Sequence, residues 1–136
     1  MRNPLILAPL IALAACAQTP AQTAAAAQAG AAAQVELDKA LAGLVPGKPQ
    51  DCIDPRWSRE VKSYGGTILY GDLGSTKYRS DTGGGCERVG RGDVLVTRSF
   101  SGQLCRGDIA RTIDPTSRFQ TGSCSFASFI PYRKPS

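Results

Sequence analysis

The sequence predicts an all-β domain, either a small antiparallel barrel or a compact sandwich of six to seven short strands. Residues 51–136 hold several short runs rich in β-branched and aromatic residues, and turns rich in glycine separate these runs. No long helical period appears in this region. Four of the five cysteines also fall there, which indicates that covalent links support a small hydrophobic core.

The expected strands follow one another at short intervals. Residues 60–64 and 67–70 flank Gly65 and Gly66, and two adjacent glycines accept the positive φ angles of a tight hairpin turn. The further expected strands are residues 76–80, 93–100, 104–106, 109–113 and 119–126.

The segment ahead of this domain cannot build a core. Residues 17–34 are almost entirely Ala, Gln and Thr, so we expect either a disordered, extended tether or a partly helical rod. Within residues 35–44, leucines at i, i+4 and i+7 predict a short amphipathic helix: Leu37, Leu41 and Leu44. A helix this short must pack on another element to persist.

The amino terminus has the pattern of an export signal. Arg2 provides a short positive start, and residues 4–15 are apolar and carry no charge. About a dozen apolar residues are too few for a membrane-spanning helix, which takes roughly 20. Residues 1–15 are therefore expected to be a signal peptide that is removed.

The junction Leu13-Ala14-Ala15-Cys16 resembles the lipobox of bacterial lipoproteins. This resemblance implies that Cys16 carries a covalent lipid and anchors the mature protein to a membrane. Ordinary secretion, with cleavage after an Ala-x-Ala site, is the alternative. The absence of Asp after Cys16 resembles outer-membrane sorting, so the expected location is the cell envelope, at the outer membrane facing the periplasm. Residues 16–50 then comprise the lipidated cysteine, the tether and the short helix.

An oxidising compartment makes disulfides the expected state of the four domain cysteines, Cys52, Cys86, Cys105 and Cys124. Four cysteines allow three pairings, and spacing alone does not choose among them. We favour Cys86 with Cys105 and Cys52 with Cys124, because the second bond would join the two ends of the domain. Zinc is the competing interpretation, but the chain has no C-x-x-C spacing and no histidine, so we expect no metal site.

Several short segments between residues 49 and 134 form an ordered set: Asp51-Cys52-Ile53-Asp54, Thr67-Ile68-Leu69-Tyr70, Tyr78-Arg79, Cys86, Leu104-Cys105-Arg106-Gly107-Asp108, Gly122-Ser123-Cys124 and Phe129-Ile130-Pro131-Tyr132-Arg133. Together they resemble a family of small exported proteobacterial proteins, of the sphingomonad type, whose function is unknown. The resemblance implies a shared fold and the four cysteines, but no activity for any residue.

The sequence lacks histidine, the residue that enzymes most often use as a general acid or base. Without histidine, Ser-His-Asp and Cys-His mechanisms are excluded. A glycan-cleaving enzyme needs only two carboxylates, and five are available: Asp72, Asp81, Asp93, Asp108 and Asp114. No pattern places two of them on one face, and ion pairs and turn caps are the simpler role. We therefore expect no enzyme, no catalytic residue and no cofactor beyond the lipid.

Three short motifs match known binding motifs only in part. Arg91-Gly92-Asp93 and Arg106-Gly107-Asp108 spell the tripeptide that integrins recognise, but each is expected at a turn. There the glycine bends the chain and the aspartate bonds nearby backbone NH groups. Gly83-Gly84-Gly85 suggests a phosphate loop, but neither glycine pattern of such loops is complete. We expect structural roles for all three.

The charge balance leaves a binding function open. The chain has a formal net charge of +5, and its basic residues alternate with aromatic ones: Tyr64, Tyr70, Tyr78, Phe100 and Phe119. Such a mixture suits an envelope polyanion, namely lipopolysaccharide phosphates, anionic lipid headgroups or peptidoglycan carboxylates. Solvated arginines and core aromatics are the simpler explanation. Nucleic acid fits the charge but not the compartment.

These observations predict an envelope lipoprotein that acts as a non-enzymatic binding or structural module, with the membrane as its first partner and an envelope polyanion or a protein as its second. One alternative is an inhibitor of a lytic cell-wall enzyme, because some small disulfide-bonded envelope lipoproteins resemble this layout and block lysozymes by inserting a loop. The other alternative is a binder of an envelope polyanion or an envelope glycan.

Overall fold

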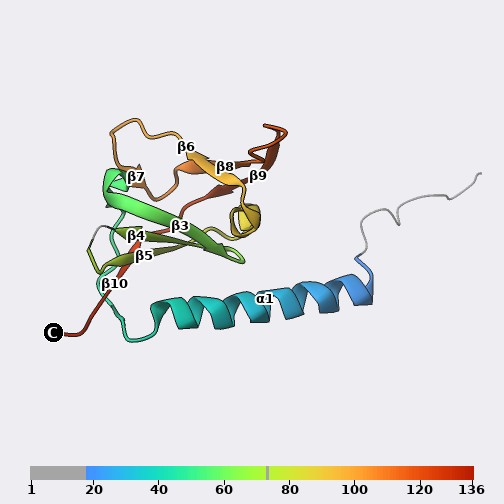
Figure 1. Ribbon diagram of the computed structural model, residues 1–136, viewed down its shortest axis with the longest axis horizontal. Helices are drawn as coiled ribbons and strands as arrows, with labels where there is room; N and C mark the ends of the chain where they lie inside the picture. Colours follow the sequence, from blue (N-terminus) through green and yellow to red (C-terminus); the bar gives the residue numbers. More distant parts are fainter. Residues whose placement is uncertain (1–17, 73) are drawn as a thin grey trace, which may run out of the picture.

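The computed structural model describes residues 18–72 and 74–136, which form one long helix and three antiparallel sheets (Figure 1). The five-stranded sheet has the order β1-β10-β5-β4-β3, with bounds Val45–Pro46, Ile130–Arg133, Lys77–Asp81, Thr67–Asp72 and Ser58–Tyr64. The three-stranded sheet has the order β6-β8-β9, with bounds Val94–Thr97, Ile109–Ile113 and Gln120–Ser125. The two-stranded sheet pairs β2 with β7, with bounds Cys52–Ile53 and Leu104–Cys105.

The described residues also form three helical segments. The helix α1 spans Pro20–Leu41, and two short 3₁₀ helices, η1 and η2, span Pro55–Trp57 and Glu87–Arg91. Among the described residues, no helix combines the length and the apolar character needed to cross a membrane. The expected signal peptide and Cys16 lie outside the described residues.

The predicted β-rich, sandwich-like architecture is confirmed, and the described strands do not close into a barrel. The predicted hairpin is the β3–β4 pair, in which Tyr64 lies opposite Thr67 and Gly65 has a φ of 57°. Strand β8 has the predicted bounds. The prediction missed β1 and β2, which have two residues each, and it missed β10, which contains Pro131.

The main core lies between the five-stranded and three-stranded sheets. Ile68 and Tyr70 point into it from β4, and Ala110 and Cys124 enter from β8 and β9. Tyr70 also contacts two buried phenylalanine rings at centroid distances of 6.1 and 6.3 Å, from Phe126 and Phe129. Such tilted aromatic contacts add to the burial of apolar area, so this cluster anchors the sandwich.

A second core lies on the other face of the five-stranded sheet. Leu69 alternates with Ile68 and Tyr70 along β4, and it packs against Leu37 and Leu41 of α1. Two of the three leucines predicted to share a helical face, Leu37 and Leu41, therefore form the face that docks, whereas Leu44 lies beyond the end of α1 and packs partly buried against the same cluster. The expected tether and short helix form one continuous helix, which a capping box of Thr19 and Gln22 begins. Residues 20–32 of this helix are exposed, and α1 runs past the edge of the sheet (Figure 1).

The four domain cysteines form two disulfides, but the pairing that we favoured is wrong. Cys52 bonds to Cys105, and Cys86 bonds to Cys124. The first pair is set by register, because Cys52 lies opposite Cys105 in the β2–β7 pair with a Cα–Cα distance of 4.0 Å. Cysteines held in disulfides are not zinc ligands, and no three ligand-type side chains gather anywhere in the described residues.

The ends of the domain are joined without a covalent bond. Val45 of β1 pairs with Arg133 of β10. Gln50 and Phe129 exchange two backbone hydrogen bonds of 2.9 and 2.8 Å. A Cys52–Cys124 bond is therefore unnecessary for closing the domain, and Cys124 is instead used to fix the segment that precedes η2.

Substituting Leu37 tests the docking of α1. Leu37 is 1% exposed, so Leu37→Ala should lower the free energy of unfolding by about 2–5 kcal/mol, because it leaves a cavity between the helix and β4. Val35 lies on the same helix but is 52% exposed, and Val35→Ala should change stability by less than about 0.5 kcal/mol. Urea unfolding followed by circular dichroism measures both. Equal effects of the two substitutions would contradict the docking.

The pairing can be checked by non-reducing tryptic digestion. Cleavage after Lys and Arg places the four cysteines on four separate peptides, residues 40–56, 80–88, 99–106 and 119–133. We expect mass spectrometry to find 40–56 linked to 99–106, and 80–88 linked to 119–133. A peptide 80–88 linked to 99–106 would show the pairing that the structure excludes.

Candidate functional site

The carboxylates that were candidates for catalysis are held by donors of the protein itself. The Asp81 carboxylate accepts a bond of 2.7 Å from the Thr67 hydroxyl and pairs with Arg79 at 3.1 Å. Asp108 accepts a bond of 2.7 Å from the backbone NH of Cys105. The Asp72 side chain lies outside what the structure describes. These contacts pair both carboxylates with strand or turn neighbours, although the Asp81 side chain stays about half exposed, at 52%.

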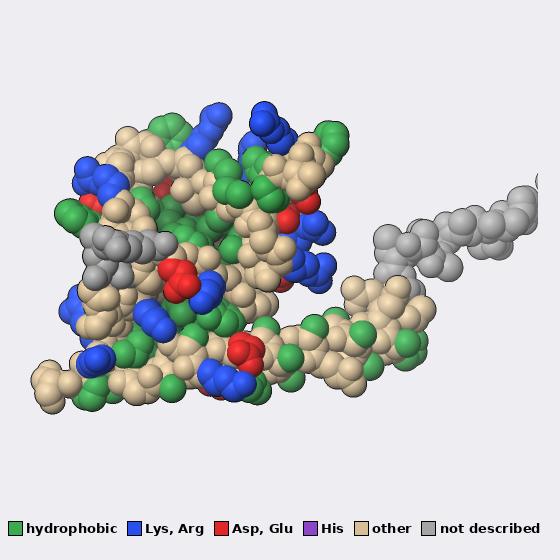
Figure 2. Space-filling view, viewed as in Figure 1, with side chains coloured by type: hydrophobic (Ala, Val, Ile, Leu, Met, Phe, Trp, Pro, Cys, Tyr) green, Lys and Arg blue, Asp and Glu red, His purple; other side chains and the backbone are tan. Residues whose placement is uncertain are grey.

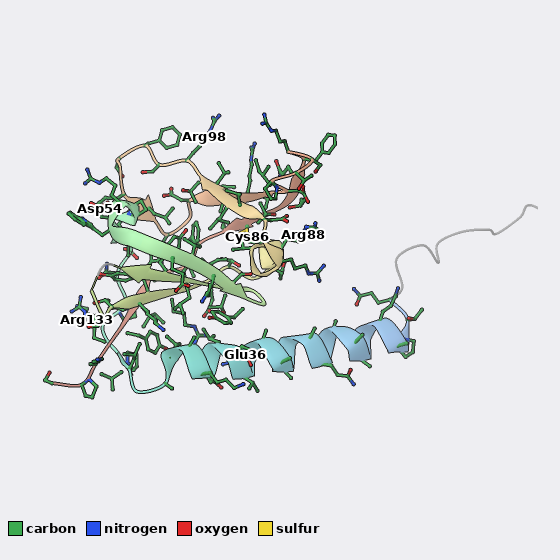
Figure 3. All side chains as sticks on the ribbon, viewed as in Figure 1. Glu36, Asp54, Cys86, Arg88, Arg98 and Arg133 are labelled. Carbon is green, nitrogen blue, oxygen red and sulfur yellow. A yellow bond between two sulfur atoms is a disulfide. The ribbon has the colours of Figure 1, made fainter. Side chains whose placement is uncertain are left out.

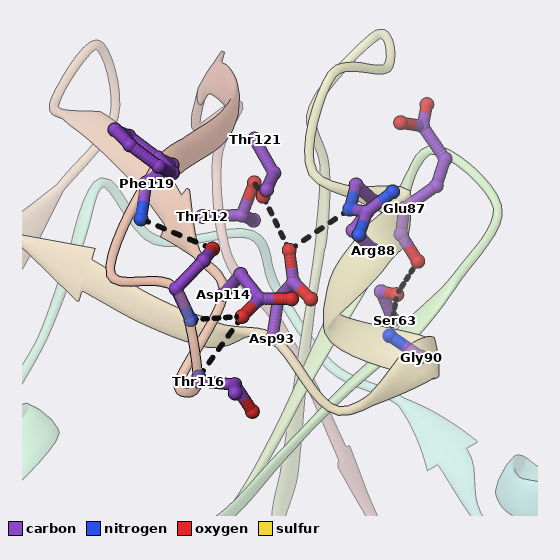
Figure 4. A network of polar contacts seen from close by, with 11 residues as sticks. Ser63, Glu87, Arg88, Gly90, Asp93, Thr112, Asp114, Thr116, Phe119 and Thr121 are labelled. Carbon is purple, nitrogen blue, oxygen red and sulfur yellow. Dashed lines mark hydrogen bonds and ion pairs between the residues drawn. The ribbon is translucent and has the colours of Figure 1, made fainter.

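Asp93 is the most deeply buried of these acids, at 8% exposed, and a polar network surrounds it (Figure 4). The Thr121 hydroxyl and Arg88 Nε, the latter at 3.0 Å, both donate to its Oδ2 atom. Thr121 Oγ1 lies 2.9 Å from the hydroxyl of Thr112, which is fully buried on β8. The hydrogen bond from Thr121, together with Arg88, lowers the pKa of Asp93 despite its burial. The network therefore joins η2 to the three-stranded sheet through an ionised carboxylate.

Asp114 caps the turn beside this network. Its carboxylate accepts backbone bonds from Ser117 and Thr116, at 2.7 and 2.9 Å, and these bonds lower its pKa (Figure 4). The nearby Asp93 charge is balanced by Arg88, so the two acids act as separate structural anchors.

Both Arg-Gly-Asp tripeptides form turns, as the sequence predicts. Gly92 ends η2 with a φ of 102°, and Gly107 has a φ of 88°. The aspartate that follows each glycine bonds within the protein, so neither tripeptide presents a free carboxylate.

The glycine run at residues 83–85 has a packing role. A Cβ atom on Gly85 would lie 2.1 Å from the backbone oxygen of Ser123, and one on Gly122 would lie 2.1 Å from the oxygen of Gly85. Only glycines allow this approach, which brings Cys86 into reach of Cys124. The backbone NH of Gly85 donates a hydrogen bond to the Glu87 carboxylate. This donor of the glycine run is therefore already used by an acid of the chain itself.

The aromatic residues that were candidates for a binding surface separate into two groups. Tyr70 is part of the main core, and Tyr64 and Tyr78 are partly buried against the two cores. Phe100 and Phe119 are exposed, Phe100 fully and Phe119 at 75%. Only these two aromatic side chains of the predicted set are free to meet a partner.

Phe100 and Phe119 border an exposed apolar surface on the three-stranded sheet, which we call the outer face. Strands β6 and β8 alternate between inward residues such as Leu95 and Ala110 and exposed ones that face away from the core. The outer face consists of Val94, Val96, Arg98, Phe100, Ile109, Arg111, Ile113, Arg118 and Phe119. It includes a shallow depression of about 390 Å³.

The arginines of the outer face exceed its acids, since Asp108, which also lines the depression, is the one acid among the lining residues and accepts a hydrogen bond from the backbone NH of Cys105. Arg98, Arg111 and Arg118 form no ion pair with any side chain that the structure describes, whereas Arg56, Arg79 and Arg88 each pair with an aspartate. Figure 2 shows apolar and basic side chains alternating along the rim farthest from α1. Figure 3 places Arg98 at this rim and Arg133 nearer the helix. Unpaired guanidinium groups beside exposed apolar side chains favour an anionic, partly apolar partner.

The sequence pattern identified part of the outer face. It pointed to Phe100 and Phe119 but not to Val94, Val96 or Ile109. Because Leu95 lies between two valines, both phases of β6 are apolar, and the pattern does not show which phase faces solvent.

Comparison with known proteins finds no match: no protein-family model fits the chain, and no curated protein or solved structure matches it. The resemblance to small exported proteins of the sphingomonad type therefore stays a prediction.

The Asp93 network predicts a pH dependence of stability. In the folded protein the pKa of Asp93 lies below the value of about 3.9 that an aspartate has in an unfolded chain. The ionised Asp93 therefore contributes its full stabilisation above about pH 4, and this stabilisation is lost as the pH falls through the folded-state pKa. Asp93→Asn should lower Tm at pH 7 by roughly 5 °C or more. It should also lose less stability than the wild type between about pH 5 and 2.

Calorimetry across this pH range measures both effects. Asp38→Asn is the control, because Asp38 is exposed on α1, and this variant should follow the wild type. Parallel pH curves for Asp93→Asn and the wild type would contradict an ionised, paired Asp93.

Proposed function

We propose that this protein is an envelope lipoprotein that acts as a non-enzymatic binding module, and that its outer face docks onto an anionic lipid surface. One observation carries the proposal: Arg98, Arg111 and the exposed Phe100 lie with exposed aliphatic side chains around one depression, and neither arginine forms an ion pair with a described side chain. Arg118 and Phe119 add a further cation and a further exposed ring in the turn that follows β8. Lipid headgroups supply the negative charge, and the acyl region beneath them accepts the apolar side chains.

The layout of the outer face suits an extended surface more than a single small ligand. Val94 pairs with Ile113, so β6 and β8 run in opposite directions. The loop that carries Phe100 and the turn that carries Phe119 therefore lie at opposite ends of β8. Five residues of strand place these ends roughly 16 Å apart, with aliphatic side chains and Arg111 between them.

The helix fits this arrangement as a spacer. It covers the five-stranded sheet on the side away from the outer face, so docking of α1 leaves the outer face open (Figure 1). A helix of 22 residues is about 33 Å long, and its first half is free of the domain. A lipid on Cys16 would hold the domain near a bilayer, where a weak contact is enough because the local concentration is high.

Binding to vesicles tests the proposal. The mature chain with Cys16→Ser, which has no lipid anchor, should bind phosphatidylglycerol vesicles more tightly than phosphatidylcholine vesicles, and raising the salt concentration should weaken this binding. Replacing Arg98 and Arg111 by Gln should weaken it by roughly tenfold or more, at about 1 kcal/mol per arginine. Phe100→Ala should also weaken it, because less apolar area is buried. Co-sedimentation measures each.

The matched control changes the same charge elsewhere. Arg133 and Lys134 are exposed near the C-terminus, and replacing both by Gln should leave vesicle binding within about twofold of the parent chain. Equal losses in both double variants would mean that net charge, not the outer face, drives binding. Binding that salt does not weaken would contradict the proposal.

A further inference from the structure

A shallow cleft of about 260 Å³ lies beside the β2–β7 pair, and it shares no residue with the outer face. We name it the Trp57 cleft, and the residues that matter to its chemistry are Gln50, Asp54, Trp57, Tyr78 and Gln103. We propose that the Trp57 cleft binds one ring of a neutral saccharide, with the indole of Trp57 as the stacking surface. This site is independent of the outer face and of its proposed function.

Trp57 is presented to solvent by a short, well-braced turn. It ends η1, which Asp54 caps by accepting the backbone NH of Arg56 at 3.0 Å, and Pro55 occupies the first helical position. The Trp57 side chain is 60% exposed, although tryptophan is usually well buried. An indole ring that a capped turn keeps exposed to solvent can stack on a partner that has an apolar face.

The polar groups of the cleft are fixed by the fold. Gln50 is locked to Phe129 by two backbone bonds, and its Nε2 atom donates to the Cys52 carbonyl at 2.8 Å. This bond sets the amide orientation and leaves Oε1 as an acceptor. Tyr78 lies on β5 between Tyr70 and Pro131 of the neighbouring strands. Its hydroxyl forms no hydrogen bond with the rest of the described chain.

Asp54 provides a charged acceptor at the same cleft. Arg56 holds both carboxylate oxygens, with Nε at 3.0 Å from Oδ1 and Nη2 at 2.7 Å from Oδ2. The side-chain bond from Arg56, followed by the bond from its backbone NH, lowers the pKa of Asp54 to about 2. The group is therefore ionised at neutral pH, and the lone pairs that Arg56 and Trp57 do not use can accept sugar hydroxyls.

Together these groups match a sugar ring better than other small ligands. A pyranose has an apolar face of C–H groups and a rim of hydroxyls, which an indole and a set of amide, carboxylate and phenol groups can meet. The described lining contains no Lys or Arg, and the neighbouring Arg56 is already paired with Asp54, so phosphate-bearing ligands such as nucleotides find no unpaired counter-charge among these residues. The volume is below the range of roughly 300–1,000 Å³ usual for ligand pockets, which suits one ring of a longer glycan.

The chain provides its own reporter for this site, because Trp57 is its single tryptophan. Titrating the mature Cys16→Ser chain with chitotriose or cellotriose should change the Trp57 emission in a saturable way, with a dissociation constant in roughly the millimolar range. Chitotriose carries N-acetyl groups and cellotriose does not, so comparing them shows whether these groups are recognised. No saturable change with either trisaccharide would overturn the proposal.

Variants followed by isothermal titration separate stacking from polar contacts. Trp57→Ala should weaken binding by at least tenfold, and Gln50→Ala and Tyr78→Phe should each weaken it by roughly threefold to tenfold. Phe119→Ala removes an exposed aromatic ring from the outer face and should bind the sugar as the parent chain does. Circular dichroism should show an unchanged fold for Trp57→Ala, because the indole is largely exposed.

Two further results would overturn the proposal whatever happens at the outer face. Unchanged sugar affinity in Trp57→Ala would place the binding elsewhere. A saturable change of Trp57 emission with inorganic phosphate, and none with sugar, would make the cleft an anion site. The Arg98 and Arg111 double variant should keep sugar binding even where vesicle binding is lost, so failure of one proposal is distinguishable from failure of the other.

Discussion

Burial of both faces of β4 is the constraint on which the rest of this structure depends. Ile68 and Tyr70 enter the core shared with the three-stranded sheet, while Leu69 between them packs against Leu37 and Leu41 of α1. A strand covered on both sides turns the five-stranded sheet into a middle layer. The helix occupies one face of that layer, so the three-stranded sheet can cover only the other, and its own far side becomes the outer face.

A disulfide and a polar network then attach the three-stranded sheet to the η2 region. The Cys86–Cys124 bond and the Asp93 network both connect the η2 region to the three-stranded sheet, one by covalent linkage and the other by an ion pair with hydrogen bonds. These contacts engage acids of the domain, and none of them reaches Arg98, Arg111 or Arg118. Arg98, Arg111 and Arg118 therefore form no ion pair with a described side chain in the region where apolar side chains are also exposed.

The two proposed surfaces differ in the chemistry that they offer. The outer face combines unpaired cations with apolar side chains over the width of a sheet, which suits a charged and extended partner. The Trp57 cleft combines one exposed indole with neutral amides and a paired carboxylate, which suits a compact polyol. Under the two proposals, the first surface orients the module at a bilayer and the second recognises a sugar.

The sequence by itself determined the local elements of this protein, because these depend on neighbouring residues. Alternation and glycine turns predicted the β3–β4 hairpin and the bounds of β8, and leucine spacing predicted which side of α1 docks. It identified Phe100 and Phe119 but not Trp57, since a lone tryptophan between turn residues carries no signal of its exposure. Only the tertiary structure decided the disulfide pairing, the solvent-facing phase of β6 and the inclusion of Pro131 in a strand. Each of these depends on register between segments far apart in the chain, and periodicity within one segment contains no information about its partner.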